Sequence, residues 1–553
     1  MTDPTFQPPE LGPTNRGPRR AVPMHADHSW LDLHWYEMPR EDPAWPEIYA
    51  YTDRLSYAPG ETVRIHASGT APRWRLQVYR DGGRPALLHD SELPGSFTPV
   101  PGDAYRSGCG WPVATELTLP ADLASGFYRI ASSCPRADGS RFLAHHFFVV
   151  RPTPATRRGR LLMLLPTATW TAYNDWGGSN HYQGIDGAAG DLASPILSLE
   201  RPWARGLLWL PEGAPRTCTS PPPRRGAAPA YTQKEWSFAN GFTQYSGSAG
   251  WAQFDRHFLL WAEREGYALD MITQTDLHYR PELLDAYAAV VIVGHDEYWT
   301  REMRLAMEAW LDRGGRLARL GGNICWQIRL EDEGRRQVCY KARAHDEDPV
   351  RGTADAHLLT SGWEDATVNW PGATTFGVNG FRGVYSGWGG LIPRGQRGFT
   401  VYRPEHWLFA GTDLGYGDVF GAEAEIFAYE VDGLDYTVRN GLPYPTGRDG
   451  APASVEILAM APAVLAETEL PGEGFRYHIG ANDLETMARL ATGAATPAAL
   501  AEYRYGAGMI VHMARGKGEV VSASSCEWVM GLARNDGDTR QITRNLLDRF
   551  IAG

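Results

Sequence analysis

The chain has 553 residues, 43% hydrophobic and 21% charged, and this length predicts two or three globular domains rather than one core. Its formal net charge is −12 and it has no long Lys/Arg block, which argues against nucleic acid as a partner. The first twenty residues lack the apolar core of a secretory signal, and no apolar run is long enough to cross a bilayer. We therefore expect a soluble, cytoplasmic protein with no membrane partner.

The first 152 residues divide into two predicted parts. Residues 1–45 are Pro-rich and then aromatic, and we interpret them as an N-terminal arm. Residues 46–152 contain short β-rich runs separated by turn signals, which predicts an all-β sandwich, and the Ser-Gly-Phe-Tyr-Arg phrase resembles immunoglobulin-like modules. The two cysteines of this part, Cys109 and Cys134, are expected to be reduced thiols. The predicted strands are Ile48–Tyr51, Thr62–Ala67, Arg75–Tyr79, Glu116–Leu119, Phe127–Ser132 and Phe142–Val150.

Residues 153–553 have alternating strand and helix patterns. This alternation predicts an α/β catalytic domain built on a parallel, doubly wound sheet, with insertions near residues 204–250 and 330–500 that add loops and strands. Thr300 is expected to cap a helix that runs to Asp312, and Gly266 to end the helix before it. The predicted elements are the strands Arg160–Leu165, Ala268–Ile272, Ala288–Val293 and Arg316–Leu320, the helix Trp251–Arg264, the paired strands Met509–Ala514 and Glu519–Ala523, and the terminal helix Asp538–Phe550.

Polar and aromatic residues collect after three of these strands. The first strand leads into the segment Thr169–Tyr182, another leads into Gly294–Trp299, and a third leads into Gly321–Trp326. In open α/β sheets, ligands bind outside the carboxyl ends of the strands. The three segments therefore predict one functional site at a single edge of the sheet.

Each of these residues also has a purely structural interpretation. His295 or Asp296 can cap the following helix, and a tyrosine at a strand end is often only a packed aromatic. Gly321-Gly322 can serve a tight turn alone. The convergence of the three segments at one edge is stronger evidence for a functional role than any single residue is.

Other catalytic patterns are weaker in this chain. Gly-x-Ser-x-Gly is absent in an elbow context, and His-Glu-x-x-His and phosphate-binding loops are missing. Cys325 lies close to the position of the nucleophile in a Cys–His glutamine-hydrolysing site, and we rank this alternative below a metal site.

The quoted segments occur in an order that resembles the large, catalytic subunit of N,N-dimethylformamidase and its relatives, over roughly residues 160–553. The resemblance implies a glutamine-amidotransferase-like α/β core that holds one iron ion through two tyrosinates and one glutamate and hydrolyses an amide. We expect the chain to lack the large lectin-like domain of that subunit, which leaves its substrate and partner open. The matching motifs are Ala172-Tyr173-Asn174, Arg201-Pro202, Gly294–Thr300, Gly322-Asn323-x-x-Trp326 and the closing stretch with Trp528.

Carried over position by position, the resemblance implies three metal ligands and three catalytic residues. Tyr231 and Tyr245 remain alternatives for the second tyrosine ligand, and Glu423 and Glu425 remain alternatives for the last glutamate. The implied ligands are Tyr173, Tyr182 and Glu297, and the implied catalytic residues are His295, Asn323 and Glu430.

Two phenolates and a carboxylate form a set of hard oxygen donors, which suits mononuclear Fe³⁺ better than zinc or copper(I). We predict an iron-dependent amidohydrolase that cleaves a small (form)amide or related C–N bond by metal-activated water, with Asn323 as oxyanion donor. Trp176, Trp299 and Trp326 are expected to wall the pocket. A homo-oligomer is expected, with a small accessory subunit left open. The competing functions are a non-catalytic carbohydrate- or ligand-binding protein and an interaction protein without metal.

Overall fold

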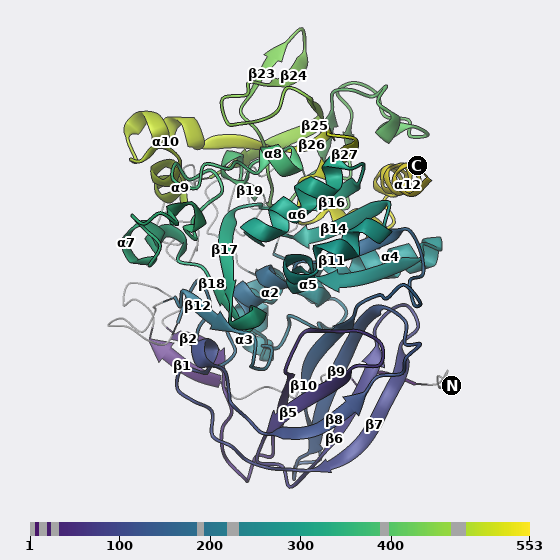
Figure 1. The fold of residues 1–553 in the computed structure, drawn as a ribbon, viewed down its shortest axis with the longest axis vertical. Helices are drawn as coiled ribbons and strands as arrows, with labels where there is room; N and C mark the ends of the chain where they lie inside the picture. Colours follow the sequence, from purple (N-terminus) through teal and green to yellow (C-terminus); the bar gives the residue numbers. More distant parts are fainter. Residues whose placement is uncertain are drawn as a thin grey trace.

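The computed structural model describes residues 6–9, 19–23, 33–184, 193–217, 232–386, 397–465 and 483–552 (Figure 1). In the N-terminal part, two short strands form an antiparallel hairpin: β1 (Arg19–Pro23) and β2 (Leu33–Glu37). No helix in the described ranges is both long enough and apolar enough to span a membrane.

Residues 49–150 form two β-sheets at the lower end of the molecule in Figure 1. One sheet has the order β3-β5-β8 and the other β4-β10-β9-β6-β7, and all neighbours are antiparallel except β4 and β10. Cys109 and Cys134 are buried free thiols, as expected. The elements are β3 (Tyr49–Thr52), β4 (Ser56–Tyr57), β5 (Thr62–Ser68), β6 (Arg73–Arg80), β7 (Ala86–Pro94), α1 (Ala104–Ser107), β8 (Val113–Thr118), β9 (Gly126–Pro135) and β10 (Arg141–Val150).

All six predicted strands of this part are present, and two strands, the two-residue β4 and the longer β7, were not predicted. β7 is an edge strand whose side chains are mostly exposed or half-buried, so its sequence carries no apolar alternation. Its stability depends on cross-strand contacts with β6, such as the ion pair between Arg75 and Asp90 at 2.5 Å. Such contacts cannot be recognised before the pairing is known.

The large sheet is mixed rather than wholly parallel, which corrects the prediction of a parallel sheet. Its main path is β13-β11-β14-β16-β27-β26-β25-β19-β22, with β20 and β21 attached at β25. Neighbours are parallel from β13 to β27 and antiparallel from β27 onward. The strands are β11 (Leu161–Leu165), β13 (Leu269–Thr273), β14 (Ala289–His295), β16 (Arg316–Gly322), β19 (Tyr385–Ser386), β20 (Phe399–Val401), β21 (Val419–Phe420), β22 (Tyr429–Glu430), β25 (Val455–Val464), β26 (Tyr505–Arg515) and β27 (Gly518–Ala523).

Successive residues of the parallel strands face two separate cores, because side chains alternate across a strand. In β14, Val291 and Val293 pack into the core that contains α4, α11 and α12, whereas Val290 and Ile292 pack into the core that contains α5 and α6. Helices therefore cover both faces, as Figure 1 shows. They are α2 (Thr167–Tyr173), α4 (Arg256–Glu265), α5 (Gln274–Tyr279), α6 (Arg301–Asp312), α11 (Trp528–Ala533) and α12 (Gly537–Ala552).

Two predicted helix signals are confirmed. Thr300 caps α6 by accepting a hydrogen bond from the Met303 amide, and Gly266 ends α4 in the left-handed conformation. The helix predicted from Trp251 begins instead with a π-helical turn, η2 (Trp251–Asp255). The Trp251 ring stacks on Phe127 of β9 with centroids 4.0 Å apart, and this contact packs the two N-terminal β-sheets against the α/β part.

The remaining elements elaborate the carboxyl edge and the antiparallel half. A small sheet of order β12-β18-β17-β15 lies beside the carboxyl ends of β14 and β16, and the hairpin β23-β24 projects at the upper end of Figure 1. These elements are β12 (Ile196–Ser198), α3 (Thr232–Asn240), η1 (Gln244–Gly247), η3 (Pro281–Ala286), β15 (Tyr298–Thr300), β17 (Trp326–Glu331), η4 (Asp332–Gly334), β18 (Arg336–Val338), η5 (Lys341–Arg343), α7 (Ala344–Glu347), η6 (Ala356–Leu358), α8 (Ala373–Phe376), η7 (Gly380–Arg382), η8 (Trp407–Phe409), β23 (Tyr436–Arg439), β24 (Leu442–Pro445), α9 (Asp483–Thr492) and α10 (Pro497–Tyr503).

Candidate active site

The carboxyl ends of β14 and β16 bring the predicted segments together. β14 ends at His295 and β16 ends at Gly322, and these two residues are direct partners in the parallel ladder. Gly322 packs so closely that an added Cβ would lie 2.3 Å from the Glu430 carbonyl oxygen. Glycine is therefore required at position 322, because any side chain would prevent the Glu430 backbone from lying this close. This contact places Glu430, which is distant in sequence, beside the edge of the parallel strands.

Three oxygen-bearing side chains converge at this edge. The Tyr173 hydroxyl lies 3.0 Å from Oε2 of Glu297, and the Tyr182 hydroxyl lies 2.9 and 2.8 Å from the two carboxylate oxygens. The two hydroxyls lie 2.7 Å apart. Tyr173 comes from the end of α2, Tyr182 from the following loop and Glu297 from the turn after β14, so three separate segments form one cluster.

Further groups surround this oxygen cluster. Nε1 of Trp326 donates to Oε1 of Glu297 at 2.6 Å, and the Tyr298 hydroxyl donates to that of Tyr182 at 2.7 Å. The Lys341 ammonium lies 3.5 Å from the centroid of the Tyr182 ring and 4.9 Å from that of Trp326. The cluster is therefore enclosed by aromatic rings and has one positive charge beside it.

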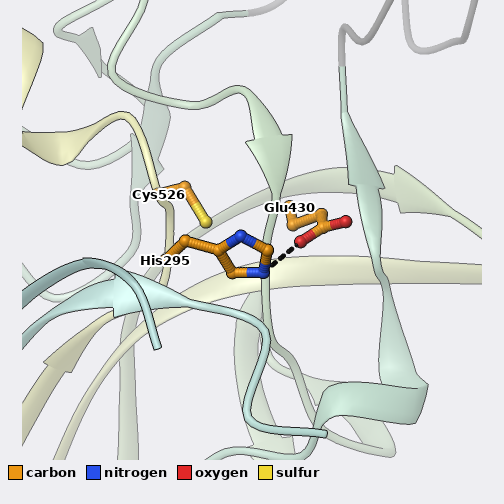
Figure 2. A group of neighbouring side chains, drawn as sticks. All are labelled: His295, Glu430 and Cys526. Carbon is orange, nitrogen blue, oxygen red and sulfur yellow. Dashed lines mark ion pairs between the residues drawn. The ribbon is translucent and has the colours of Figure 1, made fainter. Parts of the chain in front are cut away.

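A histidine–glutamate pair lies next to the oxygen cluster. Nε2 of His295 is 2.5 Å from Oε2 of Glu430 and 3.3 Å from Oε2 of Glu297. Figure 2 shows the His295 ring with Glu430 on one side and the Cys526 thiol on the other. The other ring nitrogen, Nδ1, lies 2.6 Å from the Ser248 carbonyl oxygen, so it donates its proton there. Nε2 is therefore the atom that faces the site.

Asn323 holds the glutamate of this pair. Its Nδ2 donates to Oε2 of Glu430 at 2.8 Å, and its backbone adopts the left-handed conformation with φ of 63°. One N–H of this amide is therefore directed at Glu430, and Asn323 orients that carboxylate. The oxyanion-donor role of Asn323 stays a prediction.

The electrostatics of the site follow from burial and from the close carboxylates. Burial and the neighbouring Glu297 charge raise the pKa of Tyr173 and of Tyr182 well above 10.0, so both are neutral phenols without a cation. Burial by itself would raise the pKa of Glu297, but the His295 hydrogen bond and the Lys341 charge lower it below 4.5. For His295, burial would lower the pKa, but Glu430 and Glu297 raise it to about 10.

A buried ion triad lies beneath the site. The fully buried Arg319 guanidinium pairs with Asp296 at 3.1 Å and with Asp432 at 2.6 Å. Asp296 also accepts from Nε1 of Trp299, and Asp432 accepts from the Ile324 amide at 2.9 Å. Asp296 and Trp299 are thus structural. Asp432, two residues after Glu430, connects that segment to the backbone of Ile324, the residue after Asn323.

The site opens into a pocket of about 250 Å³. Of the six predicted site residues, the pocket is lined by Tyr173, Tyr182, Glu297, Asn323 and Glu430, while His295 lies behind Glu430 and Glu297. The other lining side chains include Cys325, Trp326, Lys341, Tyr385, Tyr429, Asp483 and Met487.

Several alternative site residues lie elsewhere. The Tyr245 hydroxyl donates to Oε1 of Gln183 at 2.5 Å rather than to the Glu297 carboxylate, and Tyr231 lies outside the described residues. Glu423 is exposed, and Glu425 pairs with Arg397 and Arg534 away from the pocket.

Two of the three predicted pocket tryptophans were assigned wrongly. Trp326 lines the pocket, but Trp299 packs against Phe376 in the second core, and Trp176 packs against Tyr49 in the first. Trp299 is held away from the pocket by the hydrogen bond from its Nε1 to Asp296 and by its packing on Phe376, and closeness to Glu297 in the sequence does not reveal these contacts.

Sequence reasoning also missed residues that border the site. Lys341, Tyr385 and Asp483 come from the region treated as an insertion. Tyr298 lies within the recognised Gly294–Trp299 segment, and its aromatic ring beside Glu297 was the available signal. For the other three, no local pattern in the sequence distinguishes them.

The oxygen cluster fits a hard metal ion. Oxygen ligands about 2 Å from one ion and at right angles to one another lie about 2.8 Å apart. The separations between the Tyr173 and Tyr182 hydroxyls and the nearest Glu297 oxygen are 2.7 to 3.0 Å. His295, Glu430 and Cys526 also lie within 4.8 Å of one another, but their donors are softer and Glu430 is already engaged by Asn323.

Comparison with known proteins relates the whole of this site to one family. Two curated relatives are N,N-dimethylformamidase beta subunits. The one from Alcaligenes sp is 26% identical over 323 residues, covering 54% of this chain and 36% of the relative. The one from Paracoccus aminophilus is 25% identical over 475 residues, covering 80% of this chain and 54% of the relative. The chain therefore corresponds to about half or less of their length.

Among solved structures, Spo0M, a sporulation control protein from Bacillus subtilis, aligns with 17% identity and a TM-score of 0.14, over 20% of this chain and 51% of that chain. This similarity is too low to inform the fold. The family model that matches is described as N,N-dimethylformamidase beta subunit-like, C-terminal, and it covers residues 75–540, which include the strands from β7 to β10 before residue 152. The chain belongs to this N,N-dimethylformamidase beta subunit-like family.

Proposed function

We propose that this protein is an iron-dependent amidohydrolase that cleaves a small amide, with Fe³⁺ held by Tyr173, Tyr182 and Glu297. The observation that carries the proposal is the convergence of two phenol hydroxyls on one buried carboxylate, each within 3.0 Å. Membership of the family supports the hydrolase class. Because the chain matches only 36% and 54% of two relatives, its activity and substrate are proposals of their own.

The ligand set determines what the ion contributes. When bound, a ferric ion supplies the positive charge that removes the phenol protons, polarises an amide carbonyl and acidifies water. Trp326 donates to Glu297 and keeps one of its carboxylate oxygens in a fixed orientation. Lys341, above the Tyr182 ring, further stabilises negative charge on this side of the pocket.

His295 and Glu430 are placed to move a proton. Because Nδ1 of His295 donates to Ser248, its Nε2 shares a proton with Oε2 of Glu430 across 2.5 Å. This pair accepts a proton from the attacking water and returns it to the amine nitrogen that leaves. Asn323 positions the pair by donating to Glu430.

The pocket volume favours a small substrate. Sites for drug-sized ligands span roughly 300–1,000 Å³, whereas this pocket measures about 250 Å³. Rings of Tyr182, Trp326 and Tyr385 line it and limit the access of bulk water. We infer a formamide or a comparably small amide as substrate.

The finer architectural assignments belong to the same proposal. We infer a glutamine-amidotransferase-like core at residues 153–553 and an immunoglobulin-like sandwich at residues 46–152 behind the arm of residues 1–45. The parallel run from β13 to β27 and the two antiparallel sheets support these assignments. A cytoplasmic homo-oligomer, with or without a small accessory subunit, completes the proposal.

Elemental analysis of the purified full-length chain, together with its visible absorption spectrum, tests the function. We expect about one iron per chain and a tyrosinate-to-iron absorption band, and release of amine from a panel of formamides, larger amides and cyclic amides. Folded, active protein without a transition metal contradicts the metal assignment. A metal-free protein that binds glycans and hydrolyses no amide supports the binding-protein alternative.

A further inference from the structure

A second group of metal-ligating side chains lies on the antiparallel half of the large sheet. His406 comes directly before η8, Glu456 lies in β25 and His512 lies in β26. Glu456 and His512 are direct partners in the β25–β26 ladder. The group therefore joins a loop to two neighbouring strands, and none of its members borders the pocket of the candidate active site.

The donor atoms of this group are close enough for one ion. Nε2 of His406 lies 3.1 Å from Nδ1 of His512, and that Nδ1 lies 3.8 Å from Oε2 of Glu456. All three donor atoms lie within 4.8 Å of one another. Ligands bound tetrahedrally to zinc at about 2.0–2.1 Å lie about 3.3 Å apart, so only small side-chain movements are needed to surround an ion.

We propose that His406, Glu456 and His512 bind a divalent transition-metal ion, with Zn²⁺ as the matching ion. Two imidazoles and one carboxylate are borderline donors that suit zinc, unlike the all-oxygen set of Tyr173, Tyr182 and Glu297. The fourth position faces solvent, because the Glu456 side chain is 57% exposed.

Neighbouring residues already hold one of the imidazoles in a ligating orientation. Nε2 of His512 lies 3.1 Å from Oε2 of Glu519 and donates its proton there, so Nδ1 is the unprotonated nitrogen that faces His406 and can bind a metal ion. Glu519 is held in turn by Arg316 at 3.4 Å and Arg549 at 3.6 Å. A carboxylate behind a metal-binding histidine is the usual arrangement that fixes its tautomer and raises its basicity. The edge of Trp407 packs on the same ring.

A metal-free hydrogen-bond arrangement competes with metal binding. The Leu408 amide donates to Nδ1 of His406 at 3.2 Å, so Nε2 of His406 carries the proton that it shares with His512. Binding removes this proton and moves a proton to Nδ1, with loss of the Leu408 bond. One neutral hydrogen bond is a small loss beside the affinity of an ordered zinc site.

The site would fasten a loop to the sheet. His406 is separated from its hydrogen-bond partner His512 by 106 residues, and the loop around it carries Trp407, which packs on Phe550 of the terminal helix. Zinc would therefore link the antiparallel pair β25–β26 to the segment that covers the end of α12. The expected consequence is slower hydrogen exchange in residues 403–410 when zinc is bound.

This site is tested by calorimetric titration of the full-length protein with ZnCl₂ after dialysis against EDTA. The iron content of each sample is measured as well. The wild type is expected to bind one zinc that Glu456→Gln and His406→Gln bind at least tenfold more weakly. Glu405→Gln is the matched control, because Glu405 is exposed and adjacent to His406 but lies outside the ligand group. It is expected to bind zinc like the wild type.

The variants also separate this site from the candidate active site, because their iron content and amidase activity are expected to stay unchanged. Glu456→Gln keeps the test valid if His406→Gln fails to fold, since Glu456 is largely exposed. Equal zinc affinity in the wild type and Glu456→Gln overturns the proposal, as does the absence of zinc binding at 100 µM, which is roughly the concentration where specific sites are already filled. Unchanged hydrogen exchange in residues 403–410 on saturation with zinc contradicts the fastening role.

Discussion

The oxygen cluster around Glu297 and the histidine cluster around His512 lie on the two halves of one sheet, and they differ in donor atoms and in burial. Glu297 is 3% exposed and is surrounded by phenol groups at the carboxyl edge of parallel strands. Glu456 of the second cluster is 57% exposed and lies on the antiparallel pair β25–β26. Parallel strands gather their following loops at one edge, which builds a deep site. The second cluster instead lies on the face of two antiparallel strands, where one loop residue, His406, joins it.

The histidines of the two clusters respond to their surroundings in opposite directions. Both lose hydration by burial, which lowers the pKa of an imidazole. His295 lies between Glu430 and Glu297, and these charges raise its pKa to about 10. His406 faces His512 and the Arg549 charge, and its pKa is about 4. The comparison shows that burial lowers the pKa of both imidazoles, and that only His295 has close carboxylates that outweigh it.

The largest effect that separates the clusters is expected from Glu297→Gln. Removing this carboxylate should abolish iron loading, because a neutral amide cannot balance the ion between two phenolates. Loss of the several kcal/mol that a metal contributes to a transition state corresponds to roughly a 10³-fold drop in kcat/KM. Elemental analysis measures the iron content of the variant, and amidase kinetics measure its kcat/KM. Glu423→Gln, at an exposed position, is the control and should behave as the wild type. Full iron content in folded Glu297→Gln would refute the ligand assignment.

The second-largest effect is expected on stability, from the ion pairs that lie beside the two clusters. Breaking the Arg319–Asp432 pair should cost more than breaking the Arg316–Glu519 pair. Asp432→Asn leaves the fully buried Arg319 with one carboxylate, and breaking such a pair costs about 3–5 kcal/mol. Arg316→Gln removes a partly exposed partner of Glu519, for which about 1 kcal/mol or less is expected. Urea unfolding of the metal-free proteins gives both free energies of unfolding. Equal losses in the two variants would contradict the difference in burial on which the comparison rests.

Within the oxygen cluster, two neighbouring tyrosines sharpen the assignment. Tyr182→Phe should weaken iron binding by about 10- to 100-fold and change the visible band, because the hydroxyl beside Glu297 is lost. Tyr245→Phe removes a hydroxyl that faces Gln183 instead, and its ring lies only 6.1 Å from that of Tyr182. The spectrum and iron affinity of Tyr245→Phe should match the wild type. If the two variants behave in reverse, Tyr245 is the ligand.

The smallest effect is expected in the pH dependence of stability. The folded pKa of His406, about 4, lies below its unfolded value of 6.5, so the unfolded chain binds more protons between these values. The free energy of unfolding should therefore fall as the pH is lowered from 6.5 to 4. His406→Gln should remove part of this slope, less than the full ~1.4 kcal/mol per pH unit because the ring is partly solvated. Urea titrations in EDTA at several pH values measure the slope, and an unchanged slope would show that His406 titrates normally.

Local signals in the sequence predicted the strands and helices that depend on local periodicity. The continuous apolar run that ends in Val293 can only be a strand buried on both faces, and the Thr300 cap fixes the start of α6. The loops after β11, β14 and β16 were recognisable because their polar and aromatic residues follow apolar strands. Strands that lack such periodicity, β7 above all, were not recognisable.

The sequence by itself determined where the parallel strands lie along the chain, the edge at which the site lies and the chemical types that gather there, because each is encoded within one strand and the loop after it. The order of the strands within the sheet came from the structure. Only the tertiary structure decided which groups touch. Asn323 contacts Glu430 across 107 residues because Gly322 admits the Glu430 backbone, and Lys341 reaches the Tyr182 ring from an irregular segment. Glu456 meets His512 through the register of β25 and β26, and His406 reaches them from the loop before η8, since contacts between distant segments depend on register and on packing that no local pattern records.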